Sequence, residues 1–310
     1  MRIIFFGSPD SAVYSIKKIR ERGHSVELVI TQPDKPAGRG KKMAPSPVKR
    51  FAQSSNIQVY QPAKIRKDPR ALEIMKEADP DIIVVVAYGQ IIPSSIIYLP
   101  KFNSVNLHFS LLPKYRGASP VQWSILNGEQ KTGVTVFELN ETMDTGDILA
   151  QQELSILPGE NAHELEARLA KIGAELLCDT LARIDAIPHA PQDHSLATYA
   201  PLLKKEDGRI EWSKSAVEIE RKIRAYTPWP SAFAFFGQKR IKIVKGKGLP
   251  DRIRRLKPGE VIDVSKKGIQ VSCGENSIYL IEELQPEGKK NMSAYVFSLG
   301  ARINPGDTFL

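Results

Sequence analysis

The sequence predicts an α/β protein built on an open, mainly parallel sheet, followed by a smaller antiparallel β domain. Three observations predict this fold class. Short apolar runs alternate with helical patterns over the N-terminal third of the chain. The run DIIVVVAYG (81–89) is almost continuously apolar and rich in β-branched residues, as in a strand buried on both faces. Near the C-terminus, short β-rich runs recur with turn residues between them, which is typical of a small barrel or sandwich.

The first elements follow from hydrophobic periodicity and stop signals. RIIFFG (2–7) is a short apolar run that ends in Gly, and we predict it to be the first strand. Apolar residues then recur at helical spacing as far as Gly23, which can end a helix. SVELVIT (25–31) is predicted as the second strand and DPRALEIMKEA (68–78) as the helix before the buried run. This alternation favours an open sheet with right-handed crossovers.

Later elements indicate where one domain gives way to the next. SVNLH (104–108) and TGVTVFEL (132–139) are predicted strands, and the longest helical pattern covers 160–185. A stretch rich in Pro, His and small polar residues follows. We therefore predict a first domain over 1–187, a linker over 188–205 and a second domain over 206–310.

Composition excludes several classes of protein. The 310 residues are 42% hydrophobic and 25% charged, as in an ordinary globular protein. No apolar run is long enough to span a membrane, and the apolar start of MRIIFFGSPD is too short for the core of a signal peptide. Cys178 and Cys273 stand far apart without metal-ligand spacing, so we expect buried free thiols, no metal, no membrane partner and a cytoplasmic protein.

The net charge of +9 is unevenly distributed. Residues 201–310 hold 21 Lys/Arg against 13 Asp/Glu, residues 1–50 hold 11 against 4, and residues 51–200 hold 12 against 18. Two basic regions around an acidic one suggest surfaces turned towards a polyanion. Charge alone is explained equally well by the compositional bias of a solvated surface.

Polar residues gather where the predicted strands end. Ligands of open α/β sheets bind at the carboxyl ends of the strands, and Asn106 and His108 end one of them on the same face. Such a pair is either a buried hydrogen-bonded couple or the working edge of a site. Asp144 follows the strand at 132–139; it is either a turn-capping residue or a carboxylate that orients His108. A dinucleotide site is excluded, because GSPDSA after the first strand lacks G-x-G-x-x-G, and no Walker A motif is present.

One long motif carries a family resemblance. NLHFSLLPKYRGASPVQWSILNGEQKTGVTVFELNETMDTGDIL (106–149) resembles the core of the formyltransferases that use 10-formyltetrahydrofolate. The resemblance implies a Rossmann-like open, mainly parallel sheet followed by a small C-terminal OB-like β-barrel. It implies that Asn106 and His108 bind and polarise the formyl group and that Asp144 completes a catalytic triad, with no metal. The folate co-substrate is expected along two segments, namely Ala87, Tyr88, Gly89 and Ser110, Leu111, Leu112, Pro113.

Two features outside the core indicate which branch of the family this is. The insertion 32–50 carries six Lys/Arg and no acid from Lys35 onward, and its Pro and Gly exclude a helix. It looks like the loop with which methionyl-tRNA formyltransferases hold the acceptor end of tRNA. The second feature is the basic C-terminal domain, which begins with KKEDGRIEW (204–212) and is expected to bind tRNA too. Trp229, between two prolines, is predicted to be a packed hinge residue. The tRNA contacts expected in the loop are Lys35, Arg39, Lys41 and Lys42.

The expected reaction is formylation of the α-amino group of methionine on initiator methionyl-tRNA by a monomer. Three alternatives stay open. A formyltransferase for a small amine such as a sugar nucleotide, or a formyltetrahydrofolate hydrolase, shares the core but has no use for a basic loop and domain. A non-catalytic RNA-binding protein on the same scaffold is expected to have lost its triad, whereas Asn106, His108 and Asp144 are all present.

Overall fold

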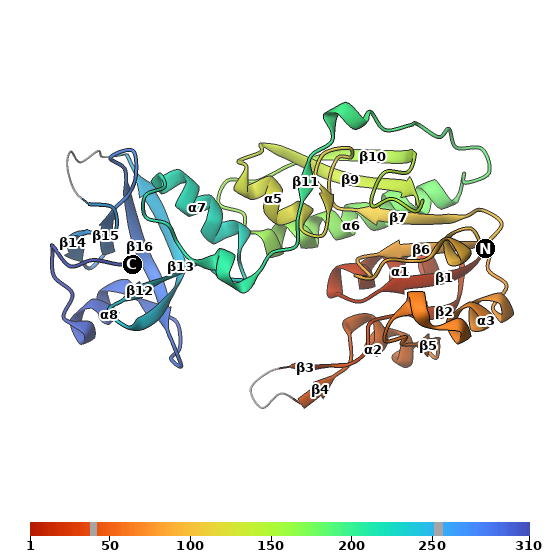
Figure 1. Ribbon diagram of the computed structural model, residues 1–310, viewed down its shortest axis with the longest axis horizontal. Coiled ribbons are helices and arrows are strands. Elements are labelled where there is room, and N and C mark those ends of the chain that lie inside the picture. Colours follow the sequence, from red (N-terminus) through yellow and green to blue (C-terminus); the bar gives the residue numbers. More distant parts are fainter. Residues whose placement is uncertain (38–41, 251–256) are drawn as a thin grey trace. The chain divides into compact units, whose positions relative to one another are not determined.

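A computed structural model of the chain describes residues 1–37, 42–250 and 257–310. The chain folds into two compact units (Figure 1). The first unit comprises 1–120, 130–155 and 166–201, and the second comprises 121–129, 156–165 and 202–310. The predicted order, an α/β part followed by a β-rich part, is confirmed.

A seven-stranded sheet with the order β10-β9-β7-β6-β1-β2-β5 forms the centre of the first unit. Neighbours from β5 through β2, β1 and β6 to β7 are parallel, whereas β9 and β10 are antiparallel. The sheet is therefore open and mainly parallel, as predicted. Its strands are β1 (Arg2–Gly7), β2 (Ser25–Ile30), β5 (Gln58–Tyr60), β6 (Ile82–Val86), β7 (Ser104–His108), β9 (Lys131–Glu138) and β10 (Ile148–Ser155).

Helices accompany this sheet, and local sequence sets where they begin. The hydroxyl of Ser46 caps α2 and the carboxylate of Asp68 caps α3, each followed by a Pro in the first turn. The α-helices are α1 (Asp10–Glu21), α2 (Pro47–Ser54), α3 (Pro69–Glu77), α4 (Ser94–Ile97) and α6 (Ala162–Leu181), with a short 3-10 helix at Ile65–Lys67. Helix α6 begins in the second unit and continues into the first. No helix of the described ranges is long and apolar enough to cross a membrane.

The centre of the sheet is buried on both faces. Every residue of β6 is buried, as are the five residues of β1 that follow Arg2. Strands of this kind accept polar side chains only near their ends, because an unpaired polar group in the middle is costly. Polar side chains that could take part in chemistry are therefore expected at the ends of these strands.

Part of the basic insertion forms regular secondary structure. Strands β3 (Lys35–Ala37) and β4 (Lys42–Ala44) pair as an antiparallel hairpin, which extends away from α2 in Figure 1. Arg39 and Lys41 lie outside the described residues. The expectation of a helix-free insertion to residue 50 is wrong at its end, because α2 begins at Pro47. Proline suits the first helical turn, since its fixed φ is already helical and its missing N–H has no intrahelical partner there.

Most residues of the segment predicted as a linker are exposed, but parts of it are attached to the rest of the first unit. β11 (Tyr199–Ala200) pairs in parallel with β8 (Arg116–Gly117), and a 3-10 helix covers His194–Leu196. Gln192 and Ala200 are buried. The first unit therefore continues to Pro201, and the chain of the second unit resumes at the next residue, Leu202.

The second unit is built around an antiparallel sheet with the order β12-β13-β16-β15-β14, and β17 pairs with β16. Trp212, Tyr279 and Phe309 lie in its core, whereas Trp229 is 53% exposed and is not the packed residue predicted. Its strands are β12 (Phe233–Phe236), β13 (Lys239–Leu249), β14 (Val261–Ser265), β15 (Gly268–Ser272), β16 (Ile278–Pro286) and β17 (Met292–Ser293). The helices are α5 (Pro120–Leu126), α7 (Ala216–Ala225), α8 (Ala294–Ala301) and a 3-10 helix at Lys205–Gly208.

Each unit contains one buried free cysteine. Cys178 lies in α6 within the first unit and Cys273 lies in the second. Burial raises the pKa of the Cys178 thiol to about 11 and that of the Cys273 thiol to about 12. Both side chains therefore behave as small hydrophobic residues, as predicted.

Truncation of Ile83 on β6 tests the core of the first unit. Ile83 is fully buried, so Ile83→Ala is expected to lower the free energy of unfolding by about 2–5 kcal/mol through lost burial and the cavity left behind. Ile91→Ala is the matched control, because Ile91 is 67% exposed. Urea denaturation of the two variants measures the difference. Equal losses would show that β6 is not central to this core.

Candidate active site

The candidate site lies at the carboxyl edge of the parallel strands. From β1 the chain builds the sheet through β2 and β5 on one side, and through β6 and β7 on the other. The strand order therefore reverses between β1 and β6, which is where open α/β sheets hold ligands. Gly7 ends β1 at this point, and a Cβ there would lie only 2.9 Å from the carbonyl oxygen of Val86. Glycine thus allows the ends of β1 and β6 to meet closely.

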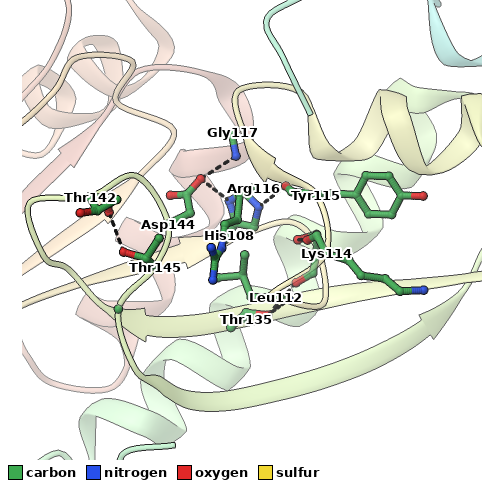
Figure 2. Close-up of polar contacts among 12 residues, drawn as sticks. His108, Leu112, Lys114, Tyr115, Arg116, Gly117, Thr135, Thr142, Asp144 and Thr145 are labelled. Carbon is green, nitrogen blue, oxygen red and sulfur yellow. Dashed lines mark hydrogen bonds and ion pairs between the residues drawn. The ribbon is translucent and has the colours of Figure 1, made fainter. Parts of the chain in front are cut away.

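His108 is the last residue of β7 and is buried. Its Nε2 lies 2.9 Å from the carbonyl oxygen of Tyr115, as Figure 2 shows. A carbonyl oxygen only accepts hydrogen bonds, so Nε2 carries a hydrogen and donates it. The other ring nitrogen, Nδ1, lies 3.9 Å from Oδ2 of Asp144, within the range of charge attraction but too far for a hydrogen bond. The backbone therefore fixes the imidazole and leaves Nδ1 for chemistry.

Asp144 lies in the loop between β9 and β10 and is also buried. Its Oδ2 accepts a hydrogen bond of 2.7 Å from the backbone N–H of Gly117. Asp144 adopts a left-handed backbone conformation with φ of 55°, which is uncommon for a residue other than Gly and is tolerated by Asp more than by most residues. The loop thus turns the carboxylate towards His108. A residue that only capped its own turn would direct its carboxylate to the backbone of that turn instead.

Asn106 precedes His108 by two residues on β7, so the two side chains share a face. It is half-buried, and among the described residues its side-chain amide forms no hydrogen bond. Such an amide has two donors and an acceptor to offer a ligand. Residues 106, 108 and 144, predicted from the sequence to act together, lie at the same edge of the sheet.

The first predicted folate segment forms an exposed turn after β6. Ala87 and Gly89 have φ of 49° and 81°, and both are exposed. The side chain of Tyr88 points the other way and is buried edge-to-face against Phe6. Burial raises the pKa of its hydroxyl well above the usual range. Only the backbone of Tyr88 is left to meet a ligand, and its carbonyl already accepts from Nε2 of Gln32.

The second predicted folate segment is held tightly by the sheet. The hydroxyl of Thr135 donates to the Ser110 carbonyl and accepts from the Leu112 N–H, while Nε2 of Gln151 donates to the Leu112 carbonyl. The Leu112 side chain is buried. A ligand would therefore meet this segment through the partly exposed side chains of Leu111 and Pro113.

Several residues of the site escaped the sequence reasoning. A Lys-Tyr-Arg sequence directly after Pro113 is typical of an exposed basic turn, but Arg116 is only 3% exposed. Its Nε and Nη2 donate to Oε1 of Gln192 at 3.1 and 2.6 Å, and Nη2 also lies 2.9 Å from Nδ1 of His194. Gln192 was assigned to the linker. The one available signal was that Arg116 and Gly117 fall inside the long motif, between His108 and Asp144.

The hairpin of the insertion is anchored at its base. Both oxygens of Asp34 lie 2.8 Å from Nζ of Lys49, and Nε2 of Gln61 donates to the same carboxylate. These hydrogen bonds, first from Lys49 and then from Gln61, lower the pKa of Asp34. Lys35 and Lys42 in the described part of the hairpin are exposed and available to a ligand. In the described ranges, no three His, Cys, Asp or Glu residues gather closely enough to hold a metal ion.

Known proteins similar to this chain are formyltransferases. Residues 1–181 match the family described as formyl transferase, and residues 202–302 match its C-terminal domain. A methionyl-tRNA formyltransferase of Geobacter sulfurreducens is 43% identical over 99% of this chain and 96% of its own length. The enzyme of the same name from Clostridium novyi is 46% identical over 98% of both chains.

Solved structures share the fold at lower sequence identity. An N-formyltransferase from Helicobacter canadensis, solved in complex with folinic acid and dTDP-3-aminofucose, aligns with a TM-score of 0.65 and 20% identity over 90% of this chain and 98% of its own. HypX from Aquifex aeolicus, in complex with tetrahydrofolic acid, aligns with a TM-score of 0.60 and 16% identity over 96% of this chain, which spans 47% of HypX. These alignments concern the fold alone.

The three polar residues at the sheet edge, the two matched domains and the full-length similarity agree with one another. The chain belongs to the formyltransferase family.

Proposed function

We propose that this protein transfers the formyl group of 10-formyltetrahydrofolate to the α-amino group of methionine on initiator methionyl-tRNA. The observation that carries the proposal is the arrangement of Asn106, His108 and Asp144 in a chain that is 40–46% identical to methionyl-tRNA formyltransferases over nearly its whole length. Identity at this level covers both domains, so it extends beyond the core that all formyltransferases share.

The edge of the sheet suits a folate formyl donor. The exposed backbone of Ala87–Gly89 lies at the switch point, next to an accessible Asn106 amide. The donor supplies an electrophilic carbonyl carbon attached to nitrogen. Asn106 can donate a hydrogen bond to the formyl oxygen, which gains negative charge as the amine attacks. Leu111 and Pro113 add apolar surface beside this edge.

His108 and Asp144 handle the charge and the proton. Because Nε2 of His108 is held by the Tyr115 carbonyl, we infer that Nδ1–H assists Asn106 in stabilising the developing oxyanion. When both ring nitrogens carry a proton, the Asp144 carboxylate faces the imidazole across a gap of 3.9 Å, and this gap leaves Nδ1–H free to donate to a substrate atom. We further infer that the Asp144 carboxylate assists removal of a proton from the attacking amine.

Recognition of the acceptor is assigned to the basic hairpin and the basic second domain. Lys35 and Lys42 are exposed on β3 and β4, and we propose that they contact tRNA phosphates together with Arg39 and Lys41. Phosphate contacts position an RNA without reading its sequence. The ion pair between Asp34 and Lys49 anchors the base of the hairpin and so limits where its basic side chains can lie.

The alternatives account for less of the chain. A small amine or water as acceptor gives no purpose to the hairpin or to the excess of basic residues after residue 200. A non-catalytic RNA-binding protein is disfavoured because all three residues of the triad are present and face the same edge. We further propose that the protein acts as a monomer in the cytoplasm, where its two free thiols would stay reduced.

The first test is a formyl-transfer assay with two acceptors. We expect transfer from 10-formyltetrahydrofolate to initiator methionyl-tRNA and little transfer to elongator methionyl-tRNA, because only the initiator is formylated in the proposed reaction. Release of tetrahydrofolate and labelled formylmethionine are followed together. Folate turnover without either tRNA would instead identify a hydrolase, and formylation of a sugar nucleotide would identify a small-amine enzyme.

Loss of the imidazole tests the role of His108. His108→Ala is expected to lower kcat by about 10²–10⁴-fold, the usual contribution of a positioned acid or base. His163→Ala is the control, since His163 lies exposed on α6 and is expected to leave kcat unchanged. Near-normal turnover of His108→Ala would remove His108 from the chemistry.

Neutralising the hairpin tests its contact with tRNA. The double change Lys35→Ala and Lys42→Ala is expected to reduce the slope of log K against log salt by about 1–2, because two fewer counterions are released on binding. Lys67→Ala with Lys76→Ala removes the same charge from exposed positions near α3 and serves as the control. Filter binding over a range of salt concentrations measures both. Identical slopes for the two variants would place the hairpin outside the RNA interface.

A further inference from the structure

We propose that Arg116 and Gln192 are positioning residues that hold Asp144 in its working place opposite His108. The inference rests on the proposed function, since it names further residues on which that reaction depends. All the residues concerned belong to the first unit.

The two neighbours of Arg116 in the chain, Tyr115 and Gly117, each contact one member of the His–Asp pair. The Tyr115 carbonyl accepts from Nε2 of His108, and the Gly117 N–H donates to Oδ2 of Asp144. Arg116 stands between them, and pairing of β8 with β11 fixes this turn of chain against Tyr199–Ala200. The side chain of Arg116 is directed into the protein, where it is 3% exposed. A shift of this segment would therefore move the imidazole and the carboxylate together.

Gln192 holds the loop that carries Asp144. Its Nε2 donates to the carbonyl oxygens of Asp144 and Gly146 at 3.0 and 2.7 Å. Asp144 has φ of 55°, a conformation that costs energy unless surrounding contacts enforce it. At Gly146 an added Cβ would lie 1.7 Å from the Glu138 carbonyl oxygen, so the backbone of the loop packs closely against the end of β9. The two hydrogen bonds from Gln192 secure the backbone on either side of this close approach.

Arg116 determines which atom of the Gln192 side-chain amide faces it, the oxygen or the nitrogen. A guanidinium has only donors, so the atom of Gln192 that it contacts must be the oxygen. The opposite atom must then be the nitrogen, and it faces two carbonyl oxygens, which only accept. Every hydrogen bond of the amide is matched in this orientation and mismatched in the reverse one. The buried Arg116 thus fixes the amide, and the amide fixes the Asp144 loop.

Gln192→Glu separates positioning from folding. A carboxylate still accepts from Arg116 and adds an ion pair, so the variant is expected to fold. It has no N–H to donate to the carbonyl oxygens of Asp144 and Gly146, however. A carboxylate oxygen would face these two oxygens instead and repel them. We expect kcat to fall by about 10²-fold, the usual effect of a displacement of about 1 Å at a catalytic group, with KM for tRNA nearly unchanged. Gln53→Glu makes the same change at an exposed position on α2 and is expected to keep wild-type kcat.

Hydrogen exchange of residues 140–147 and thermal unfolding are measured on the same variants. Faster exchange of this loop in Gln192→Glu, at a wild-type melting temperature, would support the proposal whichever acceptor the enzyme uses. Gln192→Met is uncharged and similar in size, so it gives a second reading if the carboxylate unfolds the protein. Wild-type kcat and wild-type loop exchange in both variants would overturn the proposal. An inactive wild-type protein with the expected exchange pattern would instead overturn the proposed acceptor.

Discussion

Burial of the parallel strands on both faces is the constraint on which the rest of the first unit depends. β1 and β6 offer no room for polar groups along their length, so polar side chains gather at the carboxyl edge. His108 shows the consequence. It is the last residue of a buried strand, and the turn that follows must supply its partners. The candidate catalytic residues therefore come from one strand end and one loop, and the turn after the strand supplies hydrogen-bond partners to both.

Two of the three residues at this site, Asn106 and His108, could be predicted because their signal is local. A period of two places residues 106 and 108 on one face, and a β-branched run marks the strand beside them. The alternation of strands and helices was equally readable, and so were the short strands of the second unit. Asp144 required the family motif, because nothing in its own sequence neighbourhood distinguishes it from an ordinary turn residue.

Residues whose role depends on contacts across the fold could not be predicted. A Lys-Tyr-Arg sequence after a Pro looks solvated, yet the pairing of β8 with β11 turns Arg116 inward to meet a residue 76 positions away. Gln192 sits among Pro, His and small polar residues that resemble a linker. The prediction for Trp229 was wrong in the opposite sense. A large aromatic residue between prolines suggested a packed side chain, but Trp229 is exposed. Long-range partners decide burial in each case.

The two cysteines give each unit its own chemical reporter of opening. Thiolates, not thiols, react with alkylating agents, and burial raises the pKa of Cys178 to about 11 and that of Cys273 to about 12. Both thiols are therefore protected at neutral pH by protonation as well as by lack of access. Since one lies in each unit, the two labelling rates read local unfolding of the catalytic part and the C-terminal part separately in the unmodified chain.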